Sequence, residues 1–363
     1  MKWKQERFFG QSLSYKVLPA DEYIKRFEKN VPIYTLDNKK VYVFKDFFVS
    51  VNPGGTKSYI HDKNKNILLQ SAPDSQYKLS FLTFPLNMKK RRVIILDEAV
   101  DLAIMFNNNY WHFTFTVLDK IINFEENGYK GLYIVPNVKY IKELLELTGI
   151  NKERFIYPVG NETYSINKLH VINYMYPEYF KYGIKTNAFT MKKARDLVLS
   201  HINMSDIDKY PKKIYVKRIG TRKIRNEKEV EELLKRYNFK TIIPEDYSVE
   251  EQIKTFYAAD IVICPHGANS TNALYMRPDT HFIECFGVNF IYPCMLDISK
   301  INKLNYHMLV ERAANVGCAA PNAPGIYSKD YCCDYYVDII HLDSLLYNLD
   351  EKISSCKTLE KIL

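Results

Sequence analysis

Apolar and polar residues alternate along the first part of the chain, and this alternation predicts strands joined by tight turns. The run KVYVFKDFFVSV alternates and then ends in the turn sequence Pro53-Gly54-Gly55. The next run, SYIHDKNKNILLQ, has the form of a hairpin that turns around residues 62–66. Such runs bounded by turn residues are typical of half-buried strands. We therefore expect a β-rich beginning.

A second pattern, in which apolar strands alternate with amphipathic helices, starts near residue 91. It predicts a buried strand at residues 93–96 and a helix at residues 110–122. The runs GLYIVP and RFIYPV predict two more strands, and between them VKYIKELLELTGI predicts a helix that Gly149 closes. Strands that alternate with helices in this way favour a parallel α/β sheet.

The alternation is lost around residues 175–210, and we place the connection between two domains there, with a boundary near residues 206–212. Beyond it, strands and helices alternate again. The expected strands are KIYVKR, FKTII, DIVIC and HFIECF. The sequence thus predicts a first domain at residues 1–205, a second α/β domain at residues 206–345 and a closing helix at residues 346–363.

Capping signals mark the helices of the second domain. Asn226 with Glu229 three residues later, and Ser248 with Glu251, both have the spacing of a capping box. A third helix is expected at residues 269–276. The last residues, from HLDSLL onward, predict one or two closing helices.

Length and composition agree with two soluble domains. The chain has 363 residues, of which 47% are hydrophobic and 26% are charged. Its formal net charge of +9 fits an anionic ligand, a nucleic acid or an acidic membrane surface, and does not choose among them. The densest basic run, KKRR at residues 89–92, is either a solvated turn before a strand or a docking patch, and we favour the turn.

Cysteine usage and the start of the chain predict a cytoplasmic protein with reduced thiols. The seven cysteines are scattered, without a CxxC pair or the spacing of zinc ligands. No signal peptide opens the sequence, and no apolar run approaches the ~20 residues that a membrane span needs.

The junction ICPHGANSTNALYMRP passes directly from an apolar strand into small polar residues. A helix that starts there would present free backbone N–H groups and a positive dipole end, which bind phosphate well. The residues that this turn could offer to a ligand are His266, Gly267, Ala268, Asn269, Ser270 and Thr271. The pattern predicts a phosphate-binding turn, and an ordinary loop with a capping Asn explains it equally well.

Four motifs in the same order resemble those of one known family. HGANSTNALYMRPDTHFIECF is similar to the HGAGLTN…FM-x-PG…IE signature of the family-61 glycosyltransferases. The other three similar segments are YVKRIGTRKIRNEKEVEELL, YSVEEQIKTFYAADIVIC and NNNYWHFTFTVLDKI. The resemblance covers roughly residues 40–345. Asn269, Ser270 and Asp279 depart from the family pattern, and Asn tolerates the left-handed backbone that glycine can adopt.

The resemblance implies an α/β protein with the GT-B arrangement, in which two Rossmann-like domains face each other across a cleft. It implies an inverting hexosyl- or pentosyltransferase that needs no essential metal or other cofactor. The donor would be a nucleotide-sugar, with a UDP-sugar favoured. The family includes N-acetylglucosaminyl- and xylosyltransferases and bacterial proteins of capsule or lipopolysaccharide synthesis, so the expected acceptor is a glycan or a lipid-linked glycan.

An inverting transfer needs a base for the acceptor hydroxyl, and the first domain should supply it. His112 matches the family's histidine, and a reference pKa of ~6.5 suits a base near neutral pH. Its alternative role is to order the loop. Asp97, Glu98 and Asp119 are the other candidates for the base. His170 and His307 are expected to be structural.

The departing diphosphate needs charge stabilisation on the second domain. Arg218 follows a predicted strand and could grip phosphate through two parallel hydrogen bonds. Arg222 and Lys223 are weaker candidates on the following loop, and Arg225 is expected at the surface. Glu284 either accepts hydrogen bonds from sugar hydroxyls or is a solvated carboxylate at a strand end.

Three other interpretations compete with this one. Asp206-Ile207-Asp208 could hold a metal ion, but it precedes a strand, whereas a metal-binding D-x-D normally follows one. The charge and the many tyrosines could indicate nucleic-acid binding, but the basic residues are dispersed and no RNA-recognition signature is present. A glycosyltransferase fold could also serve as a non-catalytic sugar-binding module. We expect no nucleic-acid partner, and leave open a peripheral contact with the inner face of the membrane.

Overall fold

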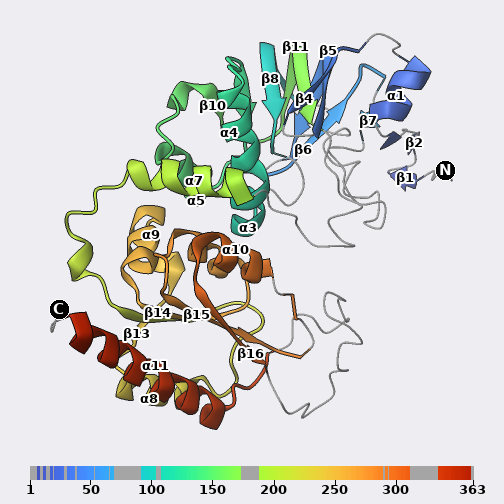
Figure 1. Ribbon diagram of the computed structural model, residues 1–363. Coiled ribbons are helices and arrows are strands. Elements are labelled where there is room, and N and C mark those ends of the chain that lie inside the picture. Colours follow the sequence, from blue (N-terminus) through green and yellow to red (C-terminus); the bar gives the residue numbers. More distant parts are fainter. Residues whose placement is uncertain are drawn as a thin grey trace. The chain divides into compact units, whose positions relative to one another are not determined.

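The chain divides into two compact units, Met1–Val198 and Leu199–Leu363. The division falls inside a helix, α7 (Ala188–Ser200), and before the predicted boundary at residues 205 and 206. The computed structural model describes residues 6–360 except 9–10, 14–16, 19, 28–30, 37–38, 53, 65, 69–90, 104–107, 173–187, 289–290, 293 and 311–333. Figure 1 shows the elements of both units.

The first unit is built on one mixed sheet, whose strands follow the order β10-β9-β8-β11-β5-β6-β7-β3, with β4 beside β5. A separate pair is formed by β1 and β2. The strands are β1 (Glu6–Phe8), β2 (Gln11–Leu13), β3 (Val17–Leu18), β4 (Ile33–Leu36), β5 (Lys39–Val51), β6 (Ser58–His61), β7 (Ile67–Leu68), β8 (Arg92–Asp101), β9 (Leu132–Ile134), β10 (Phe155–Ile156) and β11 (Glu162–Ile172).

Parallel and antiparallel halves meet at β11 in this sheet. The strands β10, β9, β8 and β11 run parallel, and their order along the chain is 3-2-1-4, which is the order of the first four strands of a Rossmann sheet. On its other side β11 pairs with β5 in the antiparallel direction. The β-rich beginning and the parallel α/β segment, both predicted from the sequence, are therefore parts of a single sheet.

The helices of the first unit lie mainly beside its parallel strands (Figure 1). They are α1 (Ala20–Phe27), α3 (Tyr110–His112), the π-helical η2 (Phe113–Leu118), α4 (Asp119–Glu126), α5 (Lys139–Glu146), the 3-10 turn η3 (Lys152–Arg154) and α7. The elements α3, η2 and α4 follow one another without a break, which confirms the helix predicted at residues 110–122. Gly149 ends the segment after α5 with a φ of 69°, a left-handed conformation that glycine adopts without strain.

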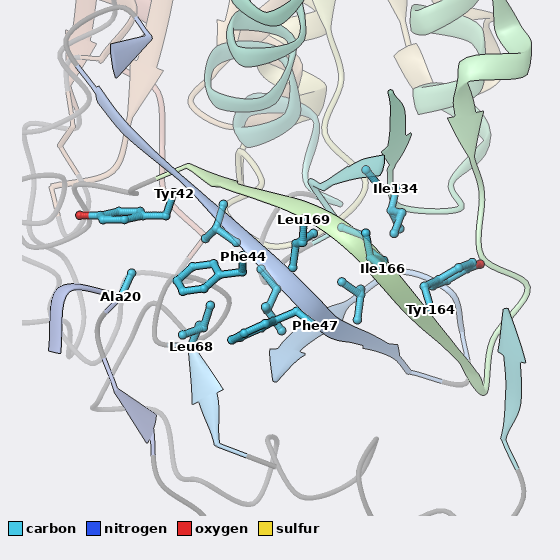
Figure 2. Packing of buried hydrophobic residues seen from close by; sticks show 14 of the residues in the cluster. Ala20, Tyr42, Phe44, Phe47, Leu68, Ile134, Tyr164, Ile166 and Leu169 are labelled. Carbon is cyan, nitrogen blue, oxygen red and sulfur yellow. The ribbon is translucent and has the colours of Figure 1, made fainter. Parts of the chain in front are cut away.

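Aromatic and aliphatic side chains from β5 and β11 form the core of the first unit (Figure 2). Phe44 and Phe47 of β5 pack with ring centroids 4.6 Å apart. The strand predicted at residues 93–96 exists but is not buried throughout. Val93 and Ile95 are 61% and 75% exposed, because alternate residues face opposite sides of the sheet and only Ile94 and Leu96 face the core.

The second unit contains a sheet whose described strands are all parallel, in the order β13-β12-β14-β15-β16. The strands are β12 (Lys213–Val216), β13 (Lys240–Ile242), β14 (Ile261–Pro265), β15 (His281–Phe286) and β16 (Asn305–Val310). Along the chain this order is 2-1-3-4-5, that of doubly wound folds. In such sheets the strand order reverses between the first and third strands, here β12 and β14, and ligands bind at the carboxyl ends of the strands at that point.

Helices cover both faces of this sheet, with α9 and α10 on one face and α8 and α11 on the other (Figure 1). The elements are η4 (Ile207–Lys209), α8 (Glu227–Arg236), η5 (Pro244–Asp246), α9 (Val249–Ala258), η6 (Ala268–Tyr275), α10 (Cys294–Asn302) and α11 (Ile339–Glu360). Val230, Leu233 and Leu234 of α8 are buried, as the predicted helical face requires. Because helices cover both faces of the sheet, its strands are buried on both sides, which explains the continuous apolar runs in their sequences.

Three local predictions need correction. Asn226 does not form a capping box, because its side chain bonds instead to the side chain of Glu229 and to the backbone of Val337. The helix expected at residues 269–276 is the 3-10 helix η6. The closing helix α11 begins at Ile339, two residues before the predicted HLDSLL run, and so within the second domain, which was predicted to extend to residue 345. The box formed by Ser248 and Glu251 is confirmed.

Polar contacts join the last helix, α11, to other elements of the second unit. It is joined to α8 through the hydroxyl of Tyr237, which donates to Asp343 at 2.5 Å, and to β12 through the contact between Lys213 and Asp350. Among the described residues, no helix combines the length and the apolar character that a membrane crossing requires.

Candidate functional site

The switch point of the second sheet brings two sequence motifs together. Arg218 follows the carboxyl end of β12, and His266 and Gly267 follow the carboxyl end of β14. A Cβ atom added to Gly267 would lie 1.9 Å from Nη1 and 2.9 Å from Cζ of Arg218. The guanidinium therefore lies directly against the backbone of Gly267.

Position 267 requires glycine because there is no room for a side chain there, and not because of its backbone conformation. Its φ of 164° and ψ of −168° are extended angles that any residue can adopt. A larger residue would instead displace the guanidinium of Arg218, whose Nε also donates to the carbonyl oxygen of Thr221. Arg218 is half-buried, so a ligand at the strand ends can reach its remaining N–H groups.

The ring of His266 forms a hydrogen bond with the buried carboxyl group of Glu284. Its Nδ1 lies 2.6 Å from Oε1 of Glu284, and its ring stacks on Phe286 with centroids 4.9 Å apart. The other carboxylate oxygen of Glu284 accepts a hydrogen bond from the hydroxyl of Tyr306 at 2.7 Å. His266 is 7% exposed and Glu284 is completely buried.

This geometry corrects the expectation that Glu284 is a solvated carboxylate at a strand end. Glu284 lies within β15, between Cys264 of β14 and Met308 of β16, and its side chain is completely buried. Sequence reasoning missed Tyr306, because it lies in a different strand and no local motif marks it. Only the parallel pairing of β15 with β16 brings Tyr306 beside Glu284.

The turn that follows is less open than the sequence predicted. Gly267, Ala268 and Asn269 are half-buried, whereas Ser270 and Thr271 are completely buried. No side chain caps η6, and the residue at its N-cap is Gly267. The predicted capping by Asn269 is therefore wrong, because its side chain donates to Glu245 at 3.2 Å instead. Ser270 and Thr271, which were expected to be available to a ligand, are buried in the protein.

Hydrogen bonds from neighbouring helices fix η6 in place. Gln252 of α9 accepts from Nδ2 of Asn272 at 3.0 Å and donates to the carbonyl of Pro244 at 2.8 Å. Asn302 of α10 donates to the carbonyl oxygens of Ala273 and Leu274. Two of the segments that resemble the family motifs, one around Gln252 and one around Asn272, thus contact each other directly.

The loop after Arg218 is tied to the segment that leads into α11. The backbone of Lys223 accepts from Tyr335 N and donates to Asp334 Oδ1 at 2.8 Å. Arg222 is half-buried with a φ of 62°. Arg225 is exposed beside the ring of Tyr336, which confirms its predicted surface position.

His112, the candidate base of the first unit, is the last residue of α3. Its backbone N–H donates to the side chain of Asn109, which caps the helix. Burial lowers the pKa of His112 to about 4. The imidazole is therefore neutral near pH 7, which is the state that can accept a proton.

The acidic alternatives lie elsewhere than expected. Asp97 and Glu98 are in the middle of β8 rather than at its end, because the strand continues to Asp101. Asp97 is exposed, whereas Glu98 binds His170 at 2.6 Å and Lys168 at 2.7 Å. Burial alone would raise the pKa of Glu98, but the hydrogen bonds from these two residues bring it below its usual range. His170 is thus structural, as predicted.

The acid at the end of β8 is Asp101, which sequence reasoning missed. It is 4% exposed and accepts hydrogen bonds from the hydroxyl of Ser58 at 2.7 and 2.8 Å and from the backbone of Ala103. Burial raises the pKa of Asp101 to about 7. The apolar pair Ala99-Val100 after Glu98 was the sequence signal that the strand continues to Asp101. Asp119 is buried in α4 and accepts from Asn123.

Metal-binding groups do not gather in the described part of the chain. Asp206 pairs with Lys254 at 3.1 Å, and Asp208 lies 3.8 Å from Lys212. No group of three or more His, Cys, Asp or Glu side chains suitable for a metal occurs among the described residues. His307 pairs with His281 at 3.1 Å. The cysteines whose side chains are described, Cys264, Cys285 and Cys294, have free thiols.

Residues 110–283 match the family model described as Glycosyltransferase 61. The match runs from the start of α3 into β15, so it includes His112, Arg218 and the turn after β14. It confirms the resemblance that the four motifs indicated. No curated protein matches the chain significantly.

Proposed function

Because the chain is a family-61 glycosyltransferase by its match over residues 110–283, we propose that it is an inverting, metal-independent enzyme that uses a nucleotide-sugar donor. A UDP-sugar is the favoured donor, and the acceptor is a hydroxyl group of a glycan or lipid-linked glycan. The product belongs to a capsule, a lipopolysaccharide or another surface glycan. The proposed location of the enzyme is the cytoplasm, and the proposal includes a peripheral contact of the protein with the inner face of the membrane.

One observation carries this proposal: the contact between Arg218 and Gly267 at the switch point of the second sheet. It places a guanidinium, the half-buried backbone of Gly267 to Asn269 and the imidazole of His266 at the edge where doubly wound sheets bind nucleotides. A guanidinium can bind two phosphate oxygens at once, and the imidazole can add a third hydrogen bond. These groups suit the diphosphate of a nucleotide-sugar.

In the proposed reaction, His112 removes the proton from the acceptor hydroxyl, whose oxygen forms a bond to the anomeric carbon of the donor sugar. The bond from that carbon to the diphosphate breaks at the same time, which inverts the configuration. Arg218 and His266 stabilise the negative charge of the leaving diphosphate. A neutral His112 is suited to this task because it does not first have to lose a proton.

A thermal-shift panel tests the proposal with UDP-, GDP-, CMP- and dTDP-sugars, each with and without EDTA. A ligand that binds only the folded protein raises the melting temperature by mass action. We expect UDP-sugars to raise it, and EDTA to leave the rise unchanged. Transfer is then measured with the donor that binds, using wild type and His112→Gln.

Each other outcome has a definite meaning. Loss of the shift in EDTA contradicts the metal-independent mechanism and points to Asp206 and Asp208. Binding without loss of transfer in His112→Gln contradicts the proposed base. Binding without transfer to any acceptor glycan favours a non-catalytic module. No shift with any donor contradicts the proposed donor class.

A further inference from the structure

The carboxylate of Glu245 lies beside the turn that carries the proposed diphosphate site. We propose that Asn269 positions Glu245 to accept hydrogen bonds from the ribose hydroxyls of the donor nucleotide, so that the enzyme selects ribonucleotide donors over deoxyribonucleotide donors. This inference rests on the proposed function, because it requires a nucleotide-sugar at the switch point of the second sheet. Glu245 contacts the substrate, and Asn269 is a positioning residue.

Three neighbouring strand ends meet at this site. In the sheet β12 lies between β13 and β14, and all three strands run parallel. Arg218 follows β12, Glu245 follows β13 within η5, and Asn269 lies in the turn after β14. Nδ2 of Asn269 donates to Oε1 of Glu245 at 3.2 Å. This bond therefore connects the segments that follow the two strands flanking β12.

The turn that carries Glu245 is fixed by the neighbouring helix α9. Nε2 of Gln252 donates to the carbonyl oxygens of Pro244 and Tyr247 at 2.8 and 3.2 Å. The ring of Pro244 restricts φ at the start of η5, and the N–H of Tyr247 donates back to Pro244 O at 3.0 Å. The backbone around Glu245 is therefore held in place, and the bond from Asn269 restricts the carboxylate itself.

Asn269 departs from the family pattern, which has glycine at this position, and the structure shows what its side chain does. It does not cap η6. Its φ is not positive, so a left-handed backbone does not explain the residue either. Its amide group instead donates to Glu245, which a glycine could not do. The contact between Asn269 and Glu245 is thus a feature of this chain.

Arg218 and Glu245 act at the same edge of the sheet without neutralising each other. Burial raises the pKa of the Cys264 thiol to about 12, and Glu245 adds to this rise while Arg218 opposes it, so both charges lie near the end of β14. In the described part of the chain the two do not form an ion pair, because Arg218 donates to Thr221 and Glu245 accepts from Asn269. One ligand at this edge would meet a positive group and a separate negative group.

The two charges select different parts of that ligand. Arg218 attracts phosphate oxygens, whereas the carboxylate of Glu245 repels them. Glu245 is exposed, and among the described residues only Asn269 donates a hydrogen bond to its carboxylate. A carboxylate offers about four acceptor positions, so it can accept more hydrogen bonds. A neutral part of the ligand that donates hydrogen bonds therefore suits the space beside Glu245.

The position of Glu245 in the fold assigns that part to the ribose. The elements β12, α8 and β13 form the first strand-helix-strand unit of this sheet. In dinucleotide-binding folds, phosphate binds after the first strand of such a unit, and an acidic residue further along the unit accepts a hydrogen bond from the ribose. Arg218 and Glu245 follow the first and second strands of the unit in the same order.

Calorimetry with UDP, GDP and the 2′-deoxy and 3′-deoxy form of each tests the inference on the full chain. For the ribonucleotide that binds more tightly, we expect wild type to bind at least one deoxy form about tenfold more weakly. The reason is that a hydrogen bond to a charged acceptor is lost. The ratio of the two affinities, which we call the ribose discrimination, is the readout.

Variants of the full chain assign the ribose discrimination to the two residues. Glu245→Ala should reduce it to about one. Asp246→Ala is the matched control, because Asp246 is also an exposed carboxylate of η5, so the same charge is removed while Glu245 stays. It should keep the wild-type discrimination. Asn269→Gly keeps the backbone of the turn but removes the amide donor, so the discrimination should fall several-fold.

Each contrary outcome has a definite meaning. Equal affinity of wild type for a ribonucleotide and both of its deoxy forms overturns the inference and leaves the proposed function intact. Discrimination that persists in Glu245→Ala or in Asn269→Gly, or that is lost in Asp246→Ala, also overturns it. If Glu245→Ala weakens a nucleotide-sugar but not the free nucleotide, the carboxylate holds the transferred sugar and the assignment to ribose is wrong.

The nucleotides that wild type binds separate failure of this inference from failure of the proposed function. Binding of dTDP, but of neither UDP nor GDP, overturns the inference alone, because dTDP lacks the 2′-hydroxyl. Absence of binding by all three nucleotides overturns both. Inorganic pyrophosphate, which has no ribose, reports the diphosphate contacts by themselves, and it should bind Glu245→Ala no more weakly than wild type.

Discussion

Nη1 of Arg218 occupies the space that a side chain on residue 267 would need, so the arginine and the glycine are matched. The two residues belong to different motifs, 49 positions apart in the chain, and meet because β12 and β14 are neighbours in the sheet. Arg218 is therefore placed by packing against a backbone as well as by its bond to Thr221. A change at either residue should affect the other.

Gly267→Ala should weaken UDP binding about tenfold while changing the free energy of unfolding little. The added methyl group displaces the guanidinium, which is the flexible end of a long side chain and can move away. Calorimetry gives the affinity, and urea denaturation gives the stability. Gly220→Ala is the matched control, because a Cβ there meets nothing within 4 Å. Equal affinity of Gly267→Ala and wild type would contradict a role for Arg218 in binding.

Arg218→Lys should reduce UDP affinity by roughly ten- to a hundredfold, even though the positive charge is kept. Lysine offers a single ammonium group and cannot form two parallel hydrogen bonds to phosphate. Binding is measured by calorimetry, with Arg225→Lys as the control on the same loop. Arg225 is exposed beside Tyr336, so its replacement should leave the affinity unchanged. An affinity of Arg218→Lys equal to wild type would show that charge alone suffices.

The sequence predicted the parallel strands of both sheets and the position of the turn, because both depend on local patterns. Apolar runs, Gly149 and the box of Ser248 and Glu251 act over a few residues, so a linear sequence displays them. The fold of the second unit and the junction after β14 could therefore be located in advance.

What the sequence did not reveal depends on partners that are distant in the chain. Nothing near Glu284 marks Tyr306 or indicates complete burial, since both arise from strand pairing. Ser270 and Thr271 were expected to face a ligand, but the tight 3-10 turn buries them. Asp101 was overlooked because the charged residues Asp97 and Glu98 suggested that the strand had ended.

His112→Gln should lower the rate of sugar transfer by about a hundredfold or more and leave UDP affinity unchanged, because the residue acts on the acceptor. The rate is followed with the donor that the thermal-shift panel identifies. His201→Ala is the control, since His201 is exposed and lies outside the proposed site. A fall in UDP affinity together with the rate would indicate a role in donor binding instead.

The pH dependence of the wild-type rate provides a second check on His112. Burial lowers its pKa to about 4, so the neutral base persists until the solution is strongly acidic. The rate should therefore not decline through loss of this base as the pH falls from 7 to 5. A decline with a midpoint near 6.5, the ordinary histidine value, would mean that a more exposed histidine is responsible.

Wild type should lose stability as the pH rises, because the buried Asp101 must then give up its proton. Asp101→Asn should not show this loss. The pKa of Asp101 is raised from 3.8 to about 7 in the folded protein, so folding favours its protonated form. That contribution is complete below pH 3.8 and is lost as the pH rises to about 7. At pH 8 the variant should be more stable by up to roughly 4 kcal/mol. Urea denaturation at pH 4 and pH 8 measures this, with the exposed Asp97→Asn as control.

Thr271→Val should raise the free energy of unfolding by about 1 kcal/mol, because Oγ1 of Thr271 is buried without a hydrogen-bond partner among the described residues. Valine keeps the branched shape and removes the hydroxyl that gains nothing from burial. Ser270→Ala is the matched control and should lower stability, since the hydroxyl of Ser270 lies 3.3 Å from Sγ of Cys264. UDP affinity should not change in Thr271→Val, because a completely buried hydroxyl cannot reach a ligand at the strand ends. A drop in affinity would mean that η6 rearranges when the donor binds and exposes Thr271 to the diphosphate.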